Sequence, residues 1–129
     1  MVSTWTAPRQ GPSGFDRRHH RPEPGAKGGD AAAGHRLARL MPRGHGWLAD
    51  HLIRAACAVP VLTAEGAHRA SPGSKRQRFS EALGECGEAA AVAELVERSA
   101  LVRGDEPAAV LAPAGRTVAL LTGLVRKFA

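Results

Sequence analysis

Aromatic residues and cysteines are scarce in this sequence. Tyrosine is absent, aromatic residues make up 4% of the 129 residues, and there are two cysteines. Two cysteines without close spacing make neither a disulfide framework nor a zinc site, so we expect Cys57 and Cys86 to be buried free thiols. The apolar content is mainly alanine, leucine and valine, a mixture that suits closely approaching helices. The composition therefore favours a small all-α domain.

Long hydrophobic runs and catalytic motifs are missing as well. The first eight residues contain no signal-peptide core, and the chain has no run of about 18 apolar residues, so we expect a cytoplasmic protein without a membrane span. The histidines lack the i, i+4 spacing of a helical metal site, and no G-x-S-x-G motif surrounds Ser71. The sequence thus predicts no enzyme, no metal or other cofactor and no small-molecule substrate.

Positive charge is plentiful but unevenly spread. The net charge is +6 and the pI is about 10.6, which predicts a polyanionic partner such as RNA or DNA. Residues 1–45 hold eight basic and three acidic side chains, whereas residues 46–129 hold ten and nine. Residues 1–29 are also rich in proline and glycine, so we predict a disordered basic tail there and a folded domain over residues 30–129. The basic run at 17–21 is either solvated or contacts phosphates.

Hydrophobic residues at three- and four-residue spacings predict four helices in the domain. The first covers Ala31–Met41 with Asp30 as its N-cap, and the second covers residues 47–64. The third runs from Pro72 to about residue 99, and the fourth runs from near residue 107 to residue 128. A heptad-like spacing predicts that the fourth helix buries positions 111, 114, 118, 121, 125 and 128. Short connections between them predict an antiparallel up-and-down four-helix bundle with a shortened first helix.

The connection between the second and third helices carries the clearest local signals. Ser71 is a hydroxyl N-cap, and Pro72 occupies the first helical position, where its missing N–H costs nothing. Gly66 is expected to end the second helix in a left-handed conformation. Pro60 should bend that helix because it lacks a hydrogen-bond donor. Cations at 69, 75, 76 and 78 surround the start of the third helix.

Those cations are Arg69, Lys75, Arg76 and Arg78. Positive charge is unfavourable at a helix N-terminus, where the macrodipole is positive. Phosphate contact explains such a cluster, and so does a solvated face with acids further along the helix. Both interpretations stay open, and the first makes these four residues the candidate nucleic-acid contacts.

Glu65 is the acidic residue that stands out in the same stretch. It could pair with Arg69 or Arg54 or act as a general base, and the ion pair is preferred because no nucleophile or second acid lies at supporting spacing. We therefore expect Glu65 to be structural.

The same region is similar to a known family. The similarity rests on Arg54-Ala55-Ala56, Val59-Pro60, Ala64-Glu65-Gly66, Arg69-Ala70-Ser71-Pro72, Phe79, Ala82-Leu83-Gly84, Glu88 and the closing segment 120–126. Together these motifs resemble the bacterial four-helix bundle family that includes proteins encoded in intervening sequences of 23S rRNA. The match covers about two-thirds of the chain. It departs from the family at Leu62, His68 and Glu85 and in its short first helix.

The resemblance implies an antiparallel bundle that assembles into ring-shaped homo-oligomers, often pentamers, without enzymatic activity. A relative, the accessory protein of diversity-generating retroelements, binds nucleic acid. The resemblance also implies structural roles for the motif residues Pro60, Glu65, Gly66, Ser71, Pro72 and Glu88. The function expected from this fold-level analogy is a non-catalytic, homo-oligomeric, nucleic-acid-associated protein. A protein–protein interaction or scaffold module, or a degenerate family member of no clear function, are the alternatives.

Overall fold

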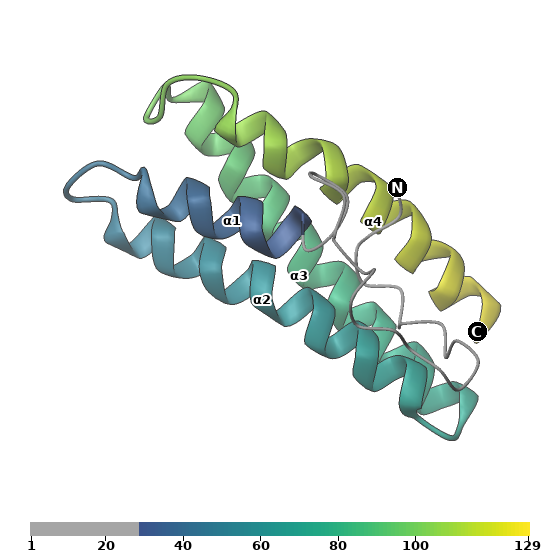
Figure 1. Ribbon diagram of the computed structural model, residues 1–129. Helices are drawn as coiled ribbons and strands as arrows, with labels where there is room; N and C mark the ends of the chain where they lie inside the picture. Colours follow the sequence, from purple (N-terminus) through teal and green to yellow (C-terminus); the bar gives the residue numbers. More distant parts are fainter. Residues whose placement is uncertain (1–28) are drawn as a thin grey trace, which may run out of the picture.

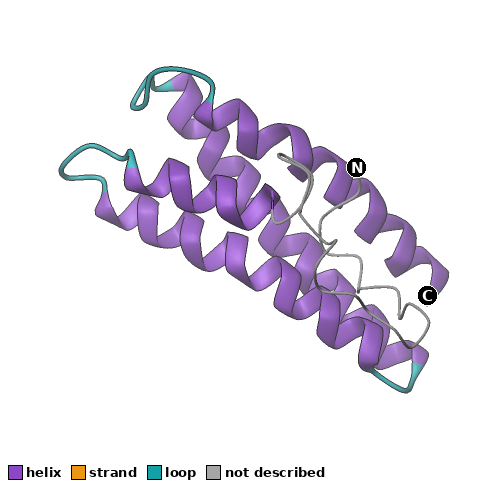
Figure 2. Ribbon diagram, viewed as in Figure 1, coloured by secondary structure: helices purple, strands orange, loops and turns teal. Residues whose placement is uncertain are grey.

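Four helices account for nearly all of the chain that the structure describes. The computed structural model describes residues 29–129, and the side chains from Ala31 onward. The helices are α1 (Gly29–Arg39), α2 (Gly46–His68), α3 (Pro72–Arg98) and α4 (Glu106–Lys127), joined by short loops (Figures 1 and 2). Successive helices run in opposite directions, so the predicted antiparallel four-helix bundle is confirmed. The predicted disordered tail lies outside the described residues, apart from its last position.

The four helices form a closed ring of neighbours in which one wall is short. α2 packs against α3, α3 against α4, and α1 against both α2 and α4. α1 has 11 residues, whereas the others have 22 to 27, so α1 covers only the half of the bundle near the 40–45 and 99–105 loops (Figure 1). Its bounds differ from the prediction: the helix already includes Asp30, which is therefore no N-cap, and it ends at Arg39.

The buried side chains divide into two clusters along the bundle axis. The cluster under α1 centres on Leu37, Leu52 and Val96, all fully buried. The cluster in the half beyond α1 centres on Phe79, Cys86 and Leu121. One side of each helix faces these clusters at helical spacing, as the hydrophobic pattern predicted.

The buried stripe of α4 is rotated relative to the prediction. Ala114 and Leu121 are buried as expected, but Pro107, Val110 and Thr117 complete the stripe. The predicted positions at 111, 118, 125 and 128 are only half-buried and pack at its edge. α4 contacts α3 along its length and α1 near its start, so its buried surface is wider than a single heptad stripe.

Gly66 does not end α2, contrary to the prediction. The helix continues to His68, and Arg69 then adopts an extended conformation with its N–H donating to the Gly66 carbonyl. Among the described glycines, positive φ angles occur at Gly44 and Gly104. Gly66 is instead buried against Phe79: a Cβ there would lie 2.6 Å from the ring's Cε1 atom. The missing side chain admits an aromatic ring and does not reverse the chain.

Pro60 is accommodated inside α2, which is one continuous helix from Gly46 to His68. The bend predicted at this residue stays a prediction. Ser71 and Pro72 begin α3 as predicted, because the Ser71 side chain accepts a hydrogen bond from the Ser74 backbone N–H at 3.2 Å.

α4 is also long and apolar enough to cross a membrane, judged by length and composition alone. An 18-residue window of this helix has a mean hydropathy of 1.6, and 22% of the window is buried inside the protein. Arg116 interrupts the apolar run in the sequence. The inner side of this helix packs in the bundle, while its outer side carries small apolar residues such as Ala108, Ala112 and Ala119.

Candidate nucleic-acid interface at one end of the bundle

The α2–α3 turn and the last turn of α4 lie at the same end of the bundle (Figure 1). The turn spans only residues 69–71, so it places the last turn of α2 beside the first turn of α3. All four predicted nucleic-acid contacts belong to this end, but the structure gives them different surroundings.

Lys75 is half-buried and caps the end of α2. Its Nζ donates to the carbonyl oxygens of Ala67 at 2.9 Å and Gly66 at 3.4 Å. Carbonyls at a helix C-terminus lack intrahelical donors and carry the negative end of the macrodipole. The lysine therefore offsets the negative end of α2, which explains why a cation is tolerated in the first turn of α3.

Arg78 is also engaged, in two ion pairs. Its Nε lies 3.3 Å from Oε2 of Glu65, and its Nη1 lies 2.9 Å from Oε2 of Glu81. The predicted partners of Glu65, Arg69 and Arg54, are therefore wrong. Because α2 continues past residue 65, that carboxylate faces the second turn of α3, and Arg54 lies three helical turns away along α2.

Arg69 and Arg76 are the two predicted contacts that remain available. Both side chains are exposed, and neither makes an ion pair or a side-chain hydrogen bond within residues 29–129. A guanidinium that holds no carboxylate can bind a phosphate in bidentate fashion without first breaking another contact. These two arginines are therefore the strongest phosphate ligands of the predicted set.

The end of α4 adds residues that the sequence analysis did not select. The Phe128 ring stacks on Phe79 with centroids 6.0 Å apart and an interplanar angle of 29°. The Nζ of Lys127 lies 5.5 Å from the Phe128 centroid, and the Nζ of Lys75 lies 5.8 Å from it. The contact between Phe79 and Phe128 joins residues far apart in the sequence. The only feature of the sequence that pointed to it was the Arg126-Lys127-Phe128 triplet.

The charge of this end is strongly positive. We call residues 59–83 and 117–129 the basic end. Its side chains comprise two acids, Glu65 and Glu81, and six bases: Arg69, Lys75, Arg76, Arg78, Arg126 and Lys127. Both acids pair with Arg78, which leaves the other five cations without a carboxylate partner in the described residues.

Glu88 belongs to a second charged group, midway along the α2–α3 contact. Its Oε1 accepts hydrogen bonds from Nδ1 of His51 at 2.9 Å and from Nη2 of Arg54 at 2.5 Å, while Nη1 of Arg54 reaches Glu85 at 3.2 Å. The hydrogen bond from His51, followed by that from Arg54, lowers the pKa of the Glu88 carboxyl. The hydrogen bond to Glu88 in turn raises the pKa of the Arg54 guanidinium. Glu88 thus links α2 to α3.

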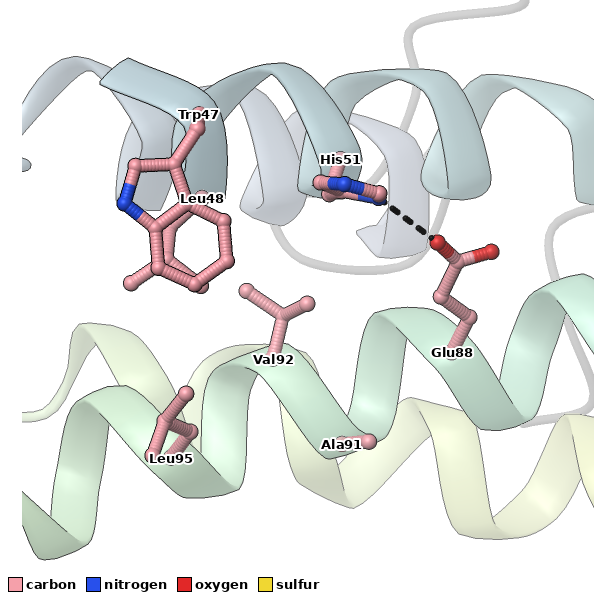
Figure 3. A pocket seen from close by; sticks show the side chains of 7 residues that line it. All are labelled: Trp47, Leu48, His51, Glu88, Ala91, Val92 and Leu95. Carbon is pink, nitrogen blue, oxygen red and sulfur yellow. Dashed lines mark hydrogen bonds and ion pairs between the residues drawn. The ribbon is translucent and has the colours of Figure 1, made fainter. Parts of the chain in front are cut away.

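A shallow pocket of about 230 Å³ lies between α2 and α3 next to this group (Figure 3). Trp47 and Leu95 stand at its rim and are 60% and 46% exposed. The indole meets the His51 ring edge-to-face with centroids 6.2 Å apart. The remaining lining residues are Leu48, Glu88, Ala91 and Val92. The pocket is mostly apolar, and the sequence pattern did not indicate it.

The two cysteines differ in their surroundings. Cys86 is buried as predicted, with its Sγ 3.6 Å from the Ala114 carbonyl oxygen. Cys57 is only half-buried, and its Sγ lies 3.5 Å from Nε2 of His35 in α1. Within residues 29–129, no three His, Cys, Asp or Glu side chains gather closely enough to hold a metal ion.

No family model, no curated protein and no solved structure matches this chain. The fold class therefore rests on the structure itself, and the similarity to the 23S rRNA intervening-sequence family stays a prediction.

Proposed function

We propose that the protein is a non-catalytic, nucleic-acid-associated protein that contacts phosphates through its basic end. The observation that carries the proposal is the pair of exposed arginines, Arg69 and Arg76, which hold no carboxylate of residues 29–129 and lie in a region of six bases and two acids. Phosphate contacts supply most of the affinity of proteins that bind nucleic acid without sequence preference. The engaged residues Lys75 and Arg78 set the positive field and the geometry of the turn.

Binding of a fluorescently labelled RNA, measured by anisotropy over a range of salt concentrations, tests this proposal. The parent should show an affinity that falls steeply with salt, because each phosphate contact releases counterions. The Arg69→Glu, Arg76→Glu double variant should bind at least tenfold more weakly, while its helicity is unchanged.

The matched control carries the same change in charge at the opposite end. Arg43 and Arg103 are exposed and lie in or beside the other two loops. The Arg43→Glu, Arg103→Glu variant should retain affinity within about twofold to threefold at physiological salt, where charges further apart than about 8 Å are largely screened. Equal loss in both double variants would show that net charge alone governs binding and would contradict the proposed interface.

We further propose that the protein acts as a homo-oligomer. Four large hydrophobic side chains are about half exposed or more: Leu40, Trp47, Val61 and Leu95. The outer side of α4 separately exposes small apolar residues, Ala108, Ala112 and Ala119. Trp47 and Leu95 lie together at the pocket between α2 and α3; contiguous exposed apolar surface marks an interface, and the family resemblance suggests a ring. Light scattering should give a multiple of the 13.5 kDa chain mass, and a monodisperse monomer at micromolar concentration would contradict this.

The pocket between α2 and α3 favours a second candidate, a protein-interaction module. An apolar hollow with an exposed tryptophan at its rim resembles the centre of many protein interfaces. Salt dependence separates the two functions, since binding of an apolar side chain at Trp47 and Leu95 responds weakly to salt. A parent protein without measurable RNA affinity would favour this second candidate.

A further inference from the structure

Phe128 occupies an unusual position for an aromatic side chain. It is half-buried at the basic end and stacks on Phe79, which is itself 3% exposed. Phe79 also packs closely against Gly66, where there is no room for a Cβ atom. The Phe128 ring is therefore supported from beneath by a packed core, and its remaining surface lies at the end of the bundle.

Two ammonium groups lie over this ring. Nζ of Lys75 and Nζ of Lys127 lie 5.8 Å and 5.5 Å from the ring centroid, and Lys127 makes no ion pair within the described residues. Each cation is attracted to the ring, but at exposed sites this attraction is weak, roughly 0.5–1 kcal/mol. Two like charges beside one ring also repel each other. An anion between or beside the lysines would offset that repulsion.

An aromatic ring flanked by cations has a natural ligand among nucleic acids. Single-stranded nucleic acids offer an unpaired base that can stack on a ring and phosphates on either side that can pair with cations. In a duplex the bases are already stacked on each other, so the ring adds nothing to the affinity. Lys75 uses its ammonium for two carbonyl oxygens and keeps one donor for a phosphate.

We propose that Phe128 is a stacking platform for an unpaired base, with Lys75 and Lys127 on the adjacent phosphates. The basic end then binds single-stranded RNA or DNA more tightly than the corresponding duplex. The inference rests on the proposed nucleic-acid function and specifies its ligand.

The test compares the full-length parent with Phe128→Leu and Phe128→Trp, using a labelled 12-nucleotide single strand and the same strand in a duplex. Phe128→Leu keeps an apolar side chain against Phe79 but removes the ring, so single-strand affinity should fall about tenfold. Duplex affinity should stay within twofold. Phe128→Trp should keep single-strand affinity or raise it.

The salt dependence distinguishes stacking from charge. Phe128→Leu should leave the slope of log affinity against log salt unchanged, whereas Lys127→Ala should reduce its magnitude by about 0.7 for a single strand. Circular dichroism and a thermal melt establish that each variant is folded.

Photo-crosslinking of the parent to a strand that contains 5-bromouracil, followed by mass spectrometry, gives a readout that needs no variant. Cross-links should fall in residues 126–129 or 75–79. An equal loss of single-strand and duplex affinity in Phe128→Leu, or a parent that prefers duplex, would overturn the inference while leaving phosphate binding at this end intact. Cross-links confined to other parts of the chain would contradict the inference and the proposed interface together. A parent that binds neither strand nor duplex would instead remove the proposed function, and the inference with it.

Discussion

The two halves of this bundle are built from the same three long helices, yet they carry different charge. The basic end, residues 59–83 and 117–129, holds six basic and two acidic side chains, whereas residues 31–58 and 84–116, which we call the balanced half, hold seven basic and seven acidic ones. In this second region Arg36 pairs with Glu106, Arg54 with Glu85 and Glu88, and Arg98 with Glu94. At the basic end, Arg78 alone takes both acids. Similar numbers of cations thus meet seven acids in the balanced half and only two at the basic end.

The halves also differ in how they are covered. α1 closes the balanced half, and Gly34 approaches Ala56 so closely that a Cβ on the glycine would lie 2.8 Å from the alanine Cβ. The half beyond α1 relies on the stacked rings of Phe79 and Phe128 at its end. The region proposed to bind ligand is therefore the one with fewer helices around its core, a common arrangement because binding surfaces need accessible side chains.

The largest stability effect that we predict for the basic end comes from Gly66→Ala. The new methyl group would meet the buried Phe79 ring at 2.6–2.8 Å, and overpacking of this kind costs roughly 1–3 kcal/mol. The gain in helix propensity offsets part of this loss. We expect a net loss of about 1–2 kcal/mol in the free energy of unfolding, measured by urea denaturation.

Gly84→Ala is the matched control for this variant. Gly84 lies inside α3, and a methyl group added there would have no neighbouring atom within 4 Å, so alanine should stabilise the helix by about 0.5–1 kcal/mol. The two glycine variants should therefore change stability in opposite directions. Two changes of the same sign would mean that Gly66 does not serve the Phe79 contact.

Ser71→Ala should cost about 1 kcal/mol, because it removes the acceptor for the Ser74 N–H at the start of α3. Ser80→Ala, an exposed serine further along the same helix, serves as the control and should change stability by less than about 0.5 kcal/mol. Thermal melts of both variants measure the difference. A loss at position 80 as large as that at position 71 would contradict the capping role.

Glu65→Gln sharpens the charge comparison between the halves. It removes one acid from the basic end and releases Arg78 from one of its two carboxylates, so RNA affinity should rise about twofold to fivefold. The cost in stability should be below about 1 kcal/mol, because the pair is partly exposed. Glu85→Gln changes the charge equally in the balanced half and should leave RNA affinity nearly unchanged. A lower affinity in Glu65→Gln would show that Arg78 must be held in place to bind.

The smallest predicted effect is a pH dependence in the balanced half. The folded structure lowers the pKa of Glu88, so its contribution to stability is fully present above the ordinary glutamate range and is lost as pH falls below about 4.5. Because the group is partly exposed, the contribution should be below about 1 kcal/mol. Glu88→Gln should lose this contribution at pH 6 and little at pH 3.5 in urea denaturation. An equal loss at both pH values would assign the effect to packing.

Features set by neighbours in the sequence were predictable, and those set by tertiary contact were not. Ser71 and Pro72 begin α3 as expected because capping depends on four consecutive residues. The predicted role of Gly66 was wrong because a glycine is required there by the ring of Phe79, which lies 13 positions further along the chain. The predicted partner of Glu65 was wrong for a related reason. Which cation Glu65 faces depends on where α2 ends, and helix ends are poorly defined by sequence.

The candidate site shows the same division. The cations at 69–78 were visible as a cluster in the sequence, but the sequence did not show which of them hold a partner. Lys75 donates to carbonyl groups, while Arg76 is free of partners within residues 29–129. Phe128 and Lys127 were missed because they reach this end only through the folded path of α4. The pocket beside Trp47 was missed because a helical pattern does not show which apolar residues remain uncovered.

The shortness of α1 has a consequence for local unfolding. With 11 residues and its main contacts to α2 and α4, this helix can detach while the α2–α3 and α3–α4 pairs stay intact. Its detachment would expose Leu37 and Leu52 to solvent and would also free the Cys57 thiol from the His35 ring. Backbone amides of residues 33–39 should therefore exchange with deuterium well before those at the centre of α3. The thiol of Cys57, which is only half-buried, should react with a maleimide faster than the buried thiol of Cys86, whose reaction requires wider unfolding.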